Sequence, residues 1–101
     1  MVLRPVPRAC PRESAILSRV VRAERLRYHW TNHAREEMAN DSIIEADIRH
    51  VLSKGPVCWV EFKADEIWHV DGTDIDGRKI RVVVAVSDAS TTIKVITTMA
   101  L

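Results

Sequence analysis

The chain has 101 residues and a mass of 11.5 kDa, a length that suits one domain around one hydrophobic core. It is 47% hydrophobic and 29% charged, which is ordinary for a globular protein and excludes wholesale disorder. No run of residues approaches the roughly 20 apolar residues of a membrane span, and the N-terminus lacks the apolar stretch of a signal peptide. We therefore expect a soluble, cytoplasmic protein that does not contact membranes.

The net charge of +1 hides an asymmetry. Residues 1–28 carry seven arginines and two glutamates, a net charge of +5, and residues 29–101 carry eight basic and twelve acidic side chains, a net charge of −4; the two sum to +1. We divide this single domain into an Arg-rich N-terminal arm and helix, residues 1–25, and an α+β part, residues 26–101. A polyanion or acidic partner would meet the arm first. The alternative is a solvated helix face with a frayed end.

The pattern of apolar residues over residues 1–30 predicts one helix and one short strand. After a Pro-rich segment, residues 1–11, apolar residues recur at helical spacing from Pro11 to about Arg25. Residues 26–30 alternate in the manner of a short strand. The apolar stripe expected on the helix consists of Ala15, Ile16, Val20 and Ala23.

Two further helices are predicted next. Thr31 or Asn32 can cap a helix that runs to about Asn40. The last helix is expected over residues 44–53, and the Gly-Pro pair that begins at Gly55 ends it. Its apolar face consists of Ile44, Ile48, Val51 and Leu52.

Beyond Gly55 the hydrophobic period changes from 3.6 to 2, which predicts strands. Turns of three or four residues separate these strands, and such short turns force antiparallel neighbours. The fold class is therefore α+β, with N-terminal helices packed on a four-stranded antiparallel sheet. The predicted strands are residues 57–62, 66–73, 78–87 and 91–99.

Alternation along the third of these strands assigns the faces of the sheet. Ile80, Val82, Val84 and Val86 form the natural core face, which leaves Lys79 and Arg81 on an open face. In the last strand Ile93, Val95, Thr97 and Met99 share one face. In the first strand, a core face of Cys58, Val60 and Phe62 would place Val57, Trp59 and Glu61 together on the open face. Cys58 then reads as an unreactive core thiol.

Several motifs in this order resemble a family of small bacterial proteins of unknown function, which are similar in outline to the RelE/BrnT-type toxins of type II toxin–antitoxin pairs. The resemblance covers about residues 28–98 and excludes the Arg-rich arm. It implies a RelE-like fold of helices on a small antiparallel sheet. The residues that carry it are His33-Ala34-Arg35-Glu36-Glu37-Met38, Ile43, Asp47-Ile48, Val51-Leu52, Gly55, Asp76 to Val84, and Val95-Ile96-Thr97.

The resemblance also implies metal-independent RNA cleavage, in which the ribose 2′-hydroxyl attacks the adjacent phosphate, and an antitoxin protein encoded nearby as the partner. This chemistry needs a base, an acid and cations that stabilise the phosphorane. Imidazoles suit the proton transfers because they titrate near neutrality. The candidate catalytic residues are His33, His69, Arg81 and Glu61, where Glu61 is a base or an orienting partner; the candidate RNA-binding residues are Lys79, Arg78, Trp59 and Arg35.

Three of these residues also have a structural interpretation. His33 would cap or pack at the strand–helix junction, His69 would be a half-buried strand residue, and Arg81 would form a surface ion pair with Glu61 or Asp71.

No metal or cofactor is expected. His29 and His33 are four residues apart, but His29 lies in a predicted strand, and the cysteines and histidines form no paired zinc motif. The three glycines lie in turns or at helix ends, so no phosphate-binding loop is present.

Two alternatives to a nuclease remain open. One is a non-catalytic module whose open sheet face, with Trp59, binds a partner protein or closes a homodimer. The other is RNA binding without cleavage through the arginine arm. The net negative charge of residues 29–101 argues for these alternatives, because affinity for phosphate increases with the number of Lys and Arg contacts. The basic and imidazole groups predicted on one small sheet argue for the nuclease.

Overall fold

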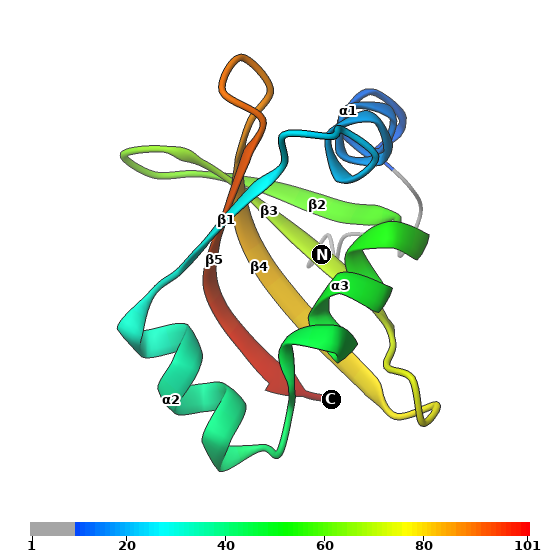
Figure 1. Ribbon diagram of the computed structural model, residues 1–101, viewed down its shortest axis with the longest axis vertical. Coiled ribbons are helices and arrows are strands. Elements are labelled where there is room, and N and C mark those ends of the chain that lie inside the picture. The colour runs from blue at the N-terminus through cyan, green and yellow to red at the C-terminus, as the bar shows by residue number, and fades with distance from the viewer. Residues whose placement is uncertain (1–9) are drawn as a thin grey trace, which may run out of the picture.

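Three helices and five strands make up residues 10–101, the part of the chain that the computed structural model describes (Figure 1). Most of the predicted Pro-rich segment, residues 1–9, lies outside the described residues. No helix in the described part is both long and apolar enough to cross a membrane. The elements are α1 (Pro11–Val21), β1 (Arg27–Trp30), α2 (Asn32–Asn40), α3 (Glu45–Lys54), β2 (Val57–Phe62), β3 (Glu66–Thr73), β4 (Lys79–Ser87) and β5 (Thr92–Ala100).

The strands form one mixed sheet in the order β1-β5-β4-β3-β2. The antiparallel pairing of β2 through β5 is confirmed, but the prediction of a four-stranded, purely antiparallel sheet is wrong, because β1 joins the sheet parallel to β5. The short-turn rule applies only to strands linked by short turns. The connection from β1 to β5 contains two helices and three strands. A connection of this length allows β1 to pair parallel to β5 at the edge of the sheet.

All three helices contribute to a single core on one face of the sheet. Leu17 and Val20 of α1, Ala34 and Met38 of α2, and three residues of α3 lie buried against the strands. The strand residues of this core are Val57, Trp68, Val70, Ile80, Val82, Val84, Ile93 and Val95. The core face predicted for β4 is therefore confirmed, and its other face carries no helix among the described elements.

Two of the helix predictions need correction. Helix α1 ends at Val21 rather than Arg25, and it buries Leu17, which the predicted stripe omitted, whereas Ala15 is exposed. Of the two caps that the sequence offers for α2, Thr31 is the one that the structure uses. Ile44 does not belong to the apolar face of α3: it is the extended residue before the helix, its side chain is 60% exposed, and its N–H donates to Asp47 Oδ2 at 3.1 Å. The apolar residues used to predict this helix therefore include one, Ile44, that precedes the first helical residue, Glu45.

Two register shifts change which side chains share a face. In β5 an extra residue at Ile96 separates the pairs Val83–Thr97 and Val84–Val95. Thr98 is therefore fully buried, so the predicted single face for Ile93, Val95, Thr97 and Met99 is wrong. In β2 the shift between Val57 and Trp59 leaves Val57 in the core, not beside Trp59 on the open face. A β-bulge reverses the inward and outward alternation, and alternation alone does not reveal it.

Thr31 connects the parallel strand to the bulge in β5. Its hydroxyl donates to the carbonyl oxygens of Val95 (2.9 Å) and Ile96 (3.0 Å) and lies 3.0 Å from the N–H of Ala34, for which it is the acceptor. Its own N–H donates to the Val95 carbonyl at 3.2 Å. One side chain thus caps α2 and forms hydrogen bonds with carbonyl oxygens at the bulge in β5.

We predict that Thr31→Ala lowers the free energy of unfolding by about 1–2 kcal/mol, the usual cost of losing a helix cap. Thr31→Ser retains the hydroxyl and should cost clearly less. Urea unfolding followed by circular dichroism measures both variants. Equal stability of the wild type and Thr31→Ala would contradict this role for the hydroxyl.

Candidate functional site

The open face of the sheet brings several predicted site residues together. Trp59 of β2 lies opposite His69 of β3, and Asp71 of β3 lies opposite Arg81 of β4. Glu61 follows Trp59 on the same face of β2, where it pairs with Ile67. We call Trp59, Glu61, His69, Asp71 and Arg81 the open-face cluster.

Stacking and ion pairing hold this cluster in one arrangement. The Trp59 indole stacks on the His69 imidazole, with ring centroids 4.1 Å apart and planes 15° apart. The Arg81 guanidinium carbon lies 4.4 Å from the centroid of the Trp59 ring. Arg81 also donates two hydrogen bonds to Asp71, from Nε at 2.7 Å and from Nη2 at 3.0 Å. Such forked pairs fix the plane of the guanidinium as well as its position.

Arg81 retains hydrogen-bonding capacity in this arrangement. Among residues 10–101, its Nη1 has no hydrogen-bond partner, since Asp71 uses only Nε and Nη2. The hydrogen bonds to Asp71 raise the pKa of Arg81 above its ordinary value, so the group stays cationic. Its side chain is 25% exposed. The guanidinium can therefore bind an anionic oxygen without leaving Asp71.

His69 and Glu61 form the second pair of the cluster. His69 Nε2 lies 3.0 Å from Glu61 Oε1, and Lys63 Nζ lies 3.8 Å from Glu61 Oε2. The hydrogen bond from His69, with a smaller effect of the Lys63 charge, lowers the pKa of Glu61. The His69 side chain is only 13% exposed, and its Nδ1 is buried without a partner in the described structure. This geometry suits His69 as a support for Glu61 better than as a proton carrier.

His33 lies outside the cluster but next to it. It is exposed in the first turn of α2 and lines a shallow groove of about 380 Å³ together with Lys63 and Lys94. We call this hollow the rim groove. The rest of its lining is Thr31, Ala64, Asp65, Ile67 and Ile96. Because Lys63 also contacts Glu61, the rim groove and the open-face cluster form one continuous surface.

Sequence reasoning missed Lys63, Lys94 and Asp71 as members of this site. Lys63 falls in the short turn predicted between residues 62 and 66, and Asp71 enters the sequence analysis only as a possible ion-pair partner of Arg81. Lys94 alternates with Ile93 and Val95 in the last predicted strand, but only the position of α2 brings His33 beside it. Only the three-dimensional structure therefore shows that Lys63, in a turn, and Lys94, in a strand, belong to the site.

The remaining predicted RNA-binding residues divide into two groups. Lys79 is exposed at the start of β4, where it lines a second shallow hollow with Asp71. The structure does not bring Arg35 or Arg78 to the site. Arg35 pairs with Glu45 at 3.4 Å and lies 5.8 Å from the centroid of the Trp30 ring.

Arg78 serves the architecture of the fold. It bonds the Asp74 carboxylate at 3.0 Å and donates to the carbonyls of Asp41 and Ser42. Burial acts to raise the pKa of Asp74, but hydrogen bonds from the backbone and side chain of Arg78 and from the Asp76 N–H together lower it. Arg78 thus ties the turn before β4 to the end of α2.

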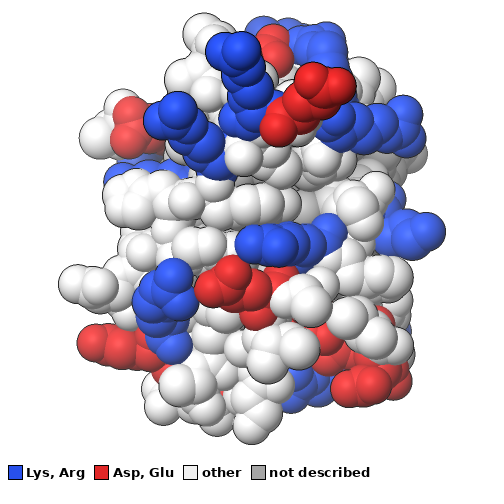
Figure 2. All heavy atoms as spheres, viewed as in Figure 1, with Lys and Arg blue, Asp and Glu red and all other residues white. Residues whose placement is uncertain are grey.

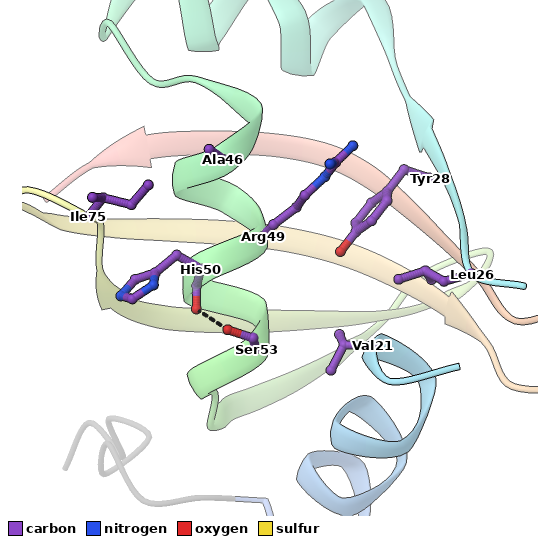
Figure 3. Close-up of a pocket in the computed structure, with 8 residues that line it drawn as sticks. All are labelled: Val21, Leu26, Tyr28, Ala46, Arg49, His50, Ser53 and Ile75. Atoms are coloured by element: carbon purple, nitrogen blue, oxygen red, sulfur yellow. Dashed lines mark hydrogen bonds between the residues drawn. The ribbon is translucent and has the colours of Figure 1, made fainter. Parts of the chain in front are cut away.

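A larger hollow, of about 570 Å³, lies on the helix side between α1, β1 and α3 (Figure 3). Arg49 lies over the Tyr28 ring there, 5.2 Å from its centroid. None of the predicted site residues lines this hollow, so its size does not mark the candidate chemistry. Its lining residues are Val21, Leu26, Tyr28, Ala46, Arg49, His50, Ser53 and Ile75.

The charges outside the site match the asymmetry of the sequence. In Figure 2, several basic side chains lie at the upper end of the molecule with a few acidic ones among them, and Figure 1 places α1 at the upper right of this end. His29 belongs to β1 and His33 to α2, so the two do not share a helix. In residues 10–101, no three His, Cys, Asp or Glu side chains are arranged to hold a metal ion.

Residues 30–100 match the model of a family described as a domain of unknown function, DUF4258. The chain belongs to the DUF4258 family. The DUF4258 match runs from the end of β1 to the end of β5 and includes every residue of the open-face cluster, as well as His33, Lys63 and Lys94 of the rim groove. Helix α1 precedes it. The comparisons found no significant match among curated proteins or among solved structures.

The lowered pKa of Glu61 predicts a pH dependence of stability. A carboxyl group whose pKa is lower in the folded state contributes stability above its unfolded pKa, and this contribution is lost as the pH falls through the folded pKa. Glu61→Gln should therefore be less stable than the wild type at pH 7, and the difference should shrink during acidification below about pH 4.5. Chemical unfolding across this pH range measures the effect.

Glu36→Gln is the matched control, since Glu36 is exposed on α2 and forms no ion pair within residues 10–101. Its stability should follow that of the wild type at every pH. A constant difference between Glu61→Gln and the wild type from pH 7 to pH 3 would show that ionisation of Glu61 does not stabilise the fold.

Proposed function

We propose that this protein is a toxin-like, metal-independent endoribonuclease that binds RNA across the open face of its sheet. One observation carries the proposal: an exposed imidazole, His33, shares a groove with Lys63 and Lys94. Lys63 in turn contacts Glu61 of the open-face cluster, which also holds the fixed Arg81 guanidinium. A proton carrier beside several cations is what cleavage through the 2′-hydroxyl requires.

Each group has a role in the proposed reaction. His33 accepts the proton of a ribose 2′-hydroxyl, and the 2′-oxygen attacks the adjacent phosphorus. A 2′,3′-cyclic phosphate forms as the bond from phosphorus to the 5′-oxygen breaks, and Lys63 donates a proton to that leaving oxygen. Lys94 and Lys63 stabilise the negative charge that develops on the phosphorane oxygens. No metal ion or cofactor takes part.

The open-face cluster supports this reaction from one side. Glu61, held by His69 at 3.0 Å, positions the ammonium group of Lys63. Arg81 offers its Nη1 to a neighbouring phosphate, and Lys79 extends the cationic track along β4. The proposal includes the RelE/BrnT-type relationship, and it therefore includes an antitoxin protein as the natural inhibitor.

A second candidate is a protein-interaction module or homodimer that uses the same face. The observation that favours it is the pairing of charges within the cluster: Arg81 is matched by Asp71, and Lys63 by Glu61. Paired charges around a partly exposed tryptophan suit a protein interface. The nuclease proposal stands ahead of it because Lys94 and His33 form no ion pair within the described residues.

The nuclease proposal predicts that the purified protein cleaves single-stranded RNA in the presence of EDTA and leaves 2′,3′-cyclic phosphate ends. His33→Ala should lower the cleavage rate by about 10²–10⁴-fold, the usual contribution of a general base. His50→Ala is the matched control, since His50 lies on the helix side, and should cleave like the wild type. Gel analysis of an end-labelled RNA measures the rates and the product ends.

Two results would contradict the nuclease. Intact RNA after prolonged incubation would do so, as would equal activity of His33→Ala and the wild type. If RNA stays intact while light scattering shows a concentration-dependent increase in mass that Arg81→Glu abolishes, the interaction module is supported instead.

A further inference from the structure

We infer that Trp59 is a stacking platform for one unpaired base of the RNA, so that the substrate is single-stranded at this site. The inference rests on the proposed function for the choice of RNA. It adds a binding subsite next to the reacting groups and a restriction on substrate structure.

The three tryptophans have different environments, and only Trp59 faces the open side of the sheet. Trp68 is 5% exposed in the core, where its Nε1–H donates to Glu66. Trp30 packs against the core on the helix side and stacks on Tyr28, with centroids 5.2 Å apart. Trp59 is partly exposed beside His69 and Arg81. A core function accounts for two of the indoles and leaves Trp59 without one.

The surroundings of Trp59 hold its ring in place. The stacked imidazole of His69 and the guanidinium of Arg81 both contact the indole, and each is tethered by a carboxylate, Glu61 and Asp71 respectively. A ring that is already immobilised loses little conformational freedom when a base stacks on it. This preorganisation favours the binding of an aromatic ligand, because less conformational entropy is lost than on a mobile surface.

Arg81 adds a second point of contact for the same nucleotide. Its Nη1 remains free of partners within residues 10–101 while the guanidinium stays beside the indole. A base stacked on Trp59 would therefore bring its own phosphate within reach of a cation. Stacking on an indole requires an open face of the base, and bases inside a duplex are already stacked and paired. The subsite therefore selects unpaired nucleotides and depends little on base identity.

The inference is tested with an RNA oligonucleotide of about eight nucleotides whose 2′-hydroxyls are methylated, so that cleavage through the 2′-oxygen is blocked. The oligonucleotide should quench part of the tryptophan fluorescence of the full-length wild-type protein. Quenching should disappear in Trp59→Phe, whose phenyl ring preserves some stacking, and should persist in the control Trp30→Phe. By fluorescence anisotropy, Trp59→Ala should bind about 5- to 150-fold more weakly. A duplex of the same sequence should bind at least tenfold more weakly than the single strand.

Several outcomes would overturn the platform: quenching that persists in Trp59→Phe, unchanged affinity of a folded Trp59→Ala, or equal binding of duplex and single strand. Circular dichroism establishes whether each variant is folded. If Trp59→Ala does not fold, Trp59→Phe provides the test. The two proposals fail separately. Cleavage that depends on His33 but not on Trp59 removes only the platform, and binding through Trp59 without cleavage removes only the nuclease.

Discussion

The hydroxyl of Thr31 lies where β1 ends, β5 bulges and α2 begins, and its hydrogen bonds hold these three elements together. The parallel pairing of β1 with β5 brings the start of α2 to the edge of the sheet. His33, two residues after Thr31, consequently lines a groove with Lys94 of β5. Without this junction the imidazole would have no fixed relation to the cations of the open face.

The helices cover one face of the sheet, and this division separates stability from chemistry. The covered face holds the apolar core, whereas the open face carries stacked and ion-paired side chains over β2, β3 and β4. In the open-face cluster Arg81 pairs with Asp71, and Glu61 pairs with Lys63 of the rim groove. The uncompensated cations lie at its borders, at Lys94 and Lys79. A ligand on this face would therefore be oriented by the rigid centre and attracted by the borders.

Much of the fold followed from hydrophobic periodicity. The bounds predicted for β2 and β3 are those of the structure, and the core face of β4 is confirmed, because period-2 alternation between short turns leaves few alternatives. The direction of β1 and the bulge at Ile96 were not predictable, since both depend on contacts between distant segments. For the site, alternation placed Arg81 and Lys79 on one face, but Lys63 entered it only through the turn that joins β2 to β3.

The central claim is that the open face, and not the helix side, receives a single-stranded RNA. Backbone amide chemical shifts of the isotope-labelled full chain, recorded during titration with a non-cleavable single-stranded oligonucleotide, test it most directly. If RNA binds there, we expect shift changes that follow β2, β3 and β4 and extend through the turn at Lys63 to the first turn of α2. Changes confined to the hollow around Tyr28 and Arg49, or no changes at saturating RNA, would contradict it.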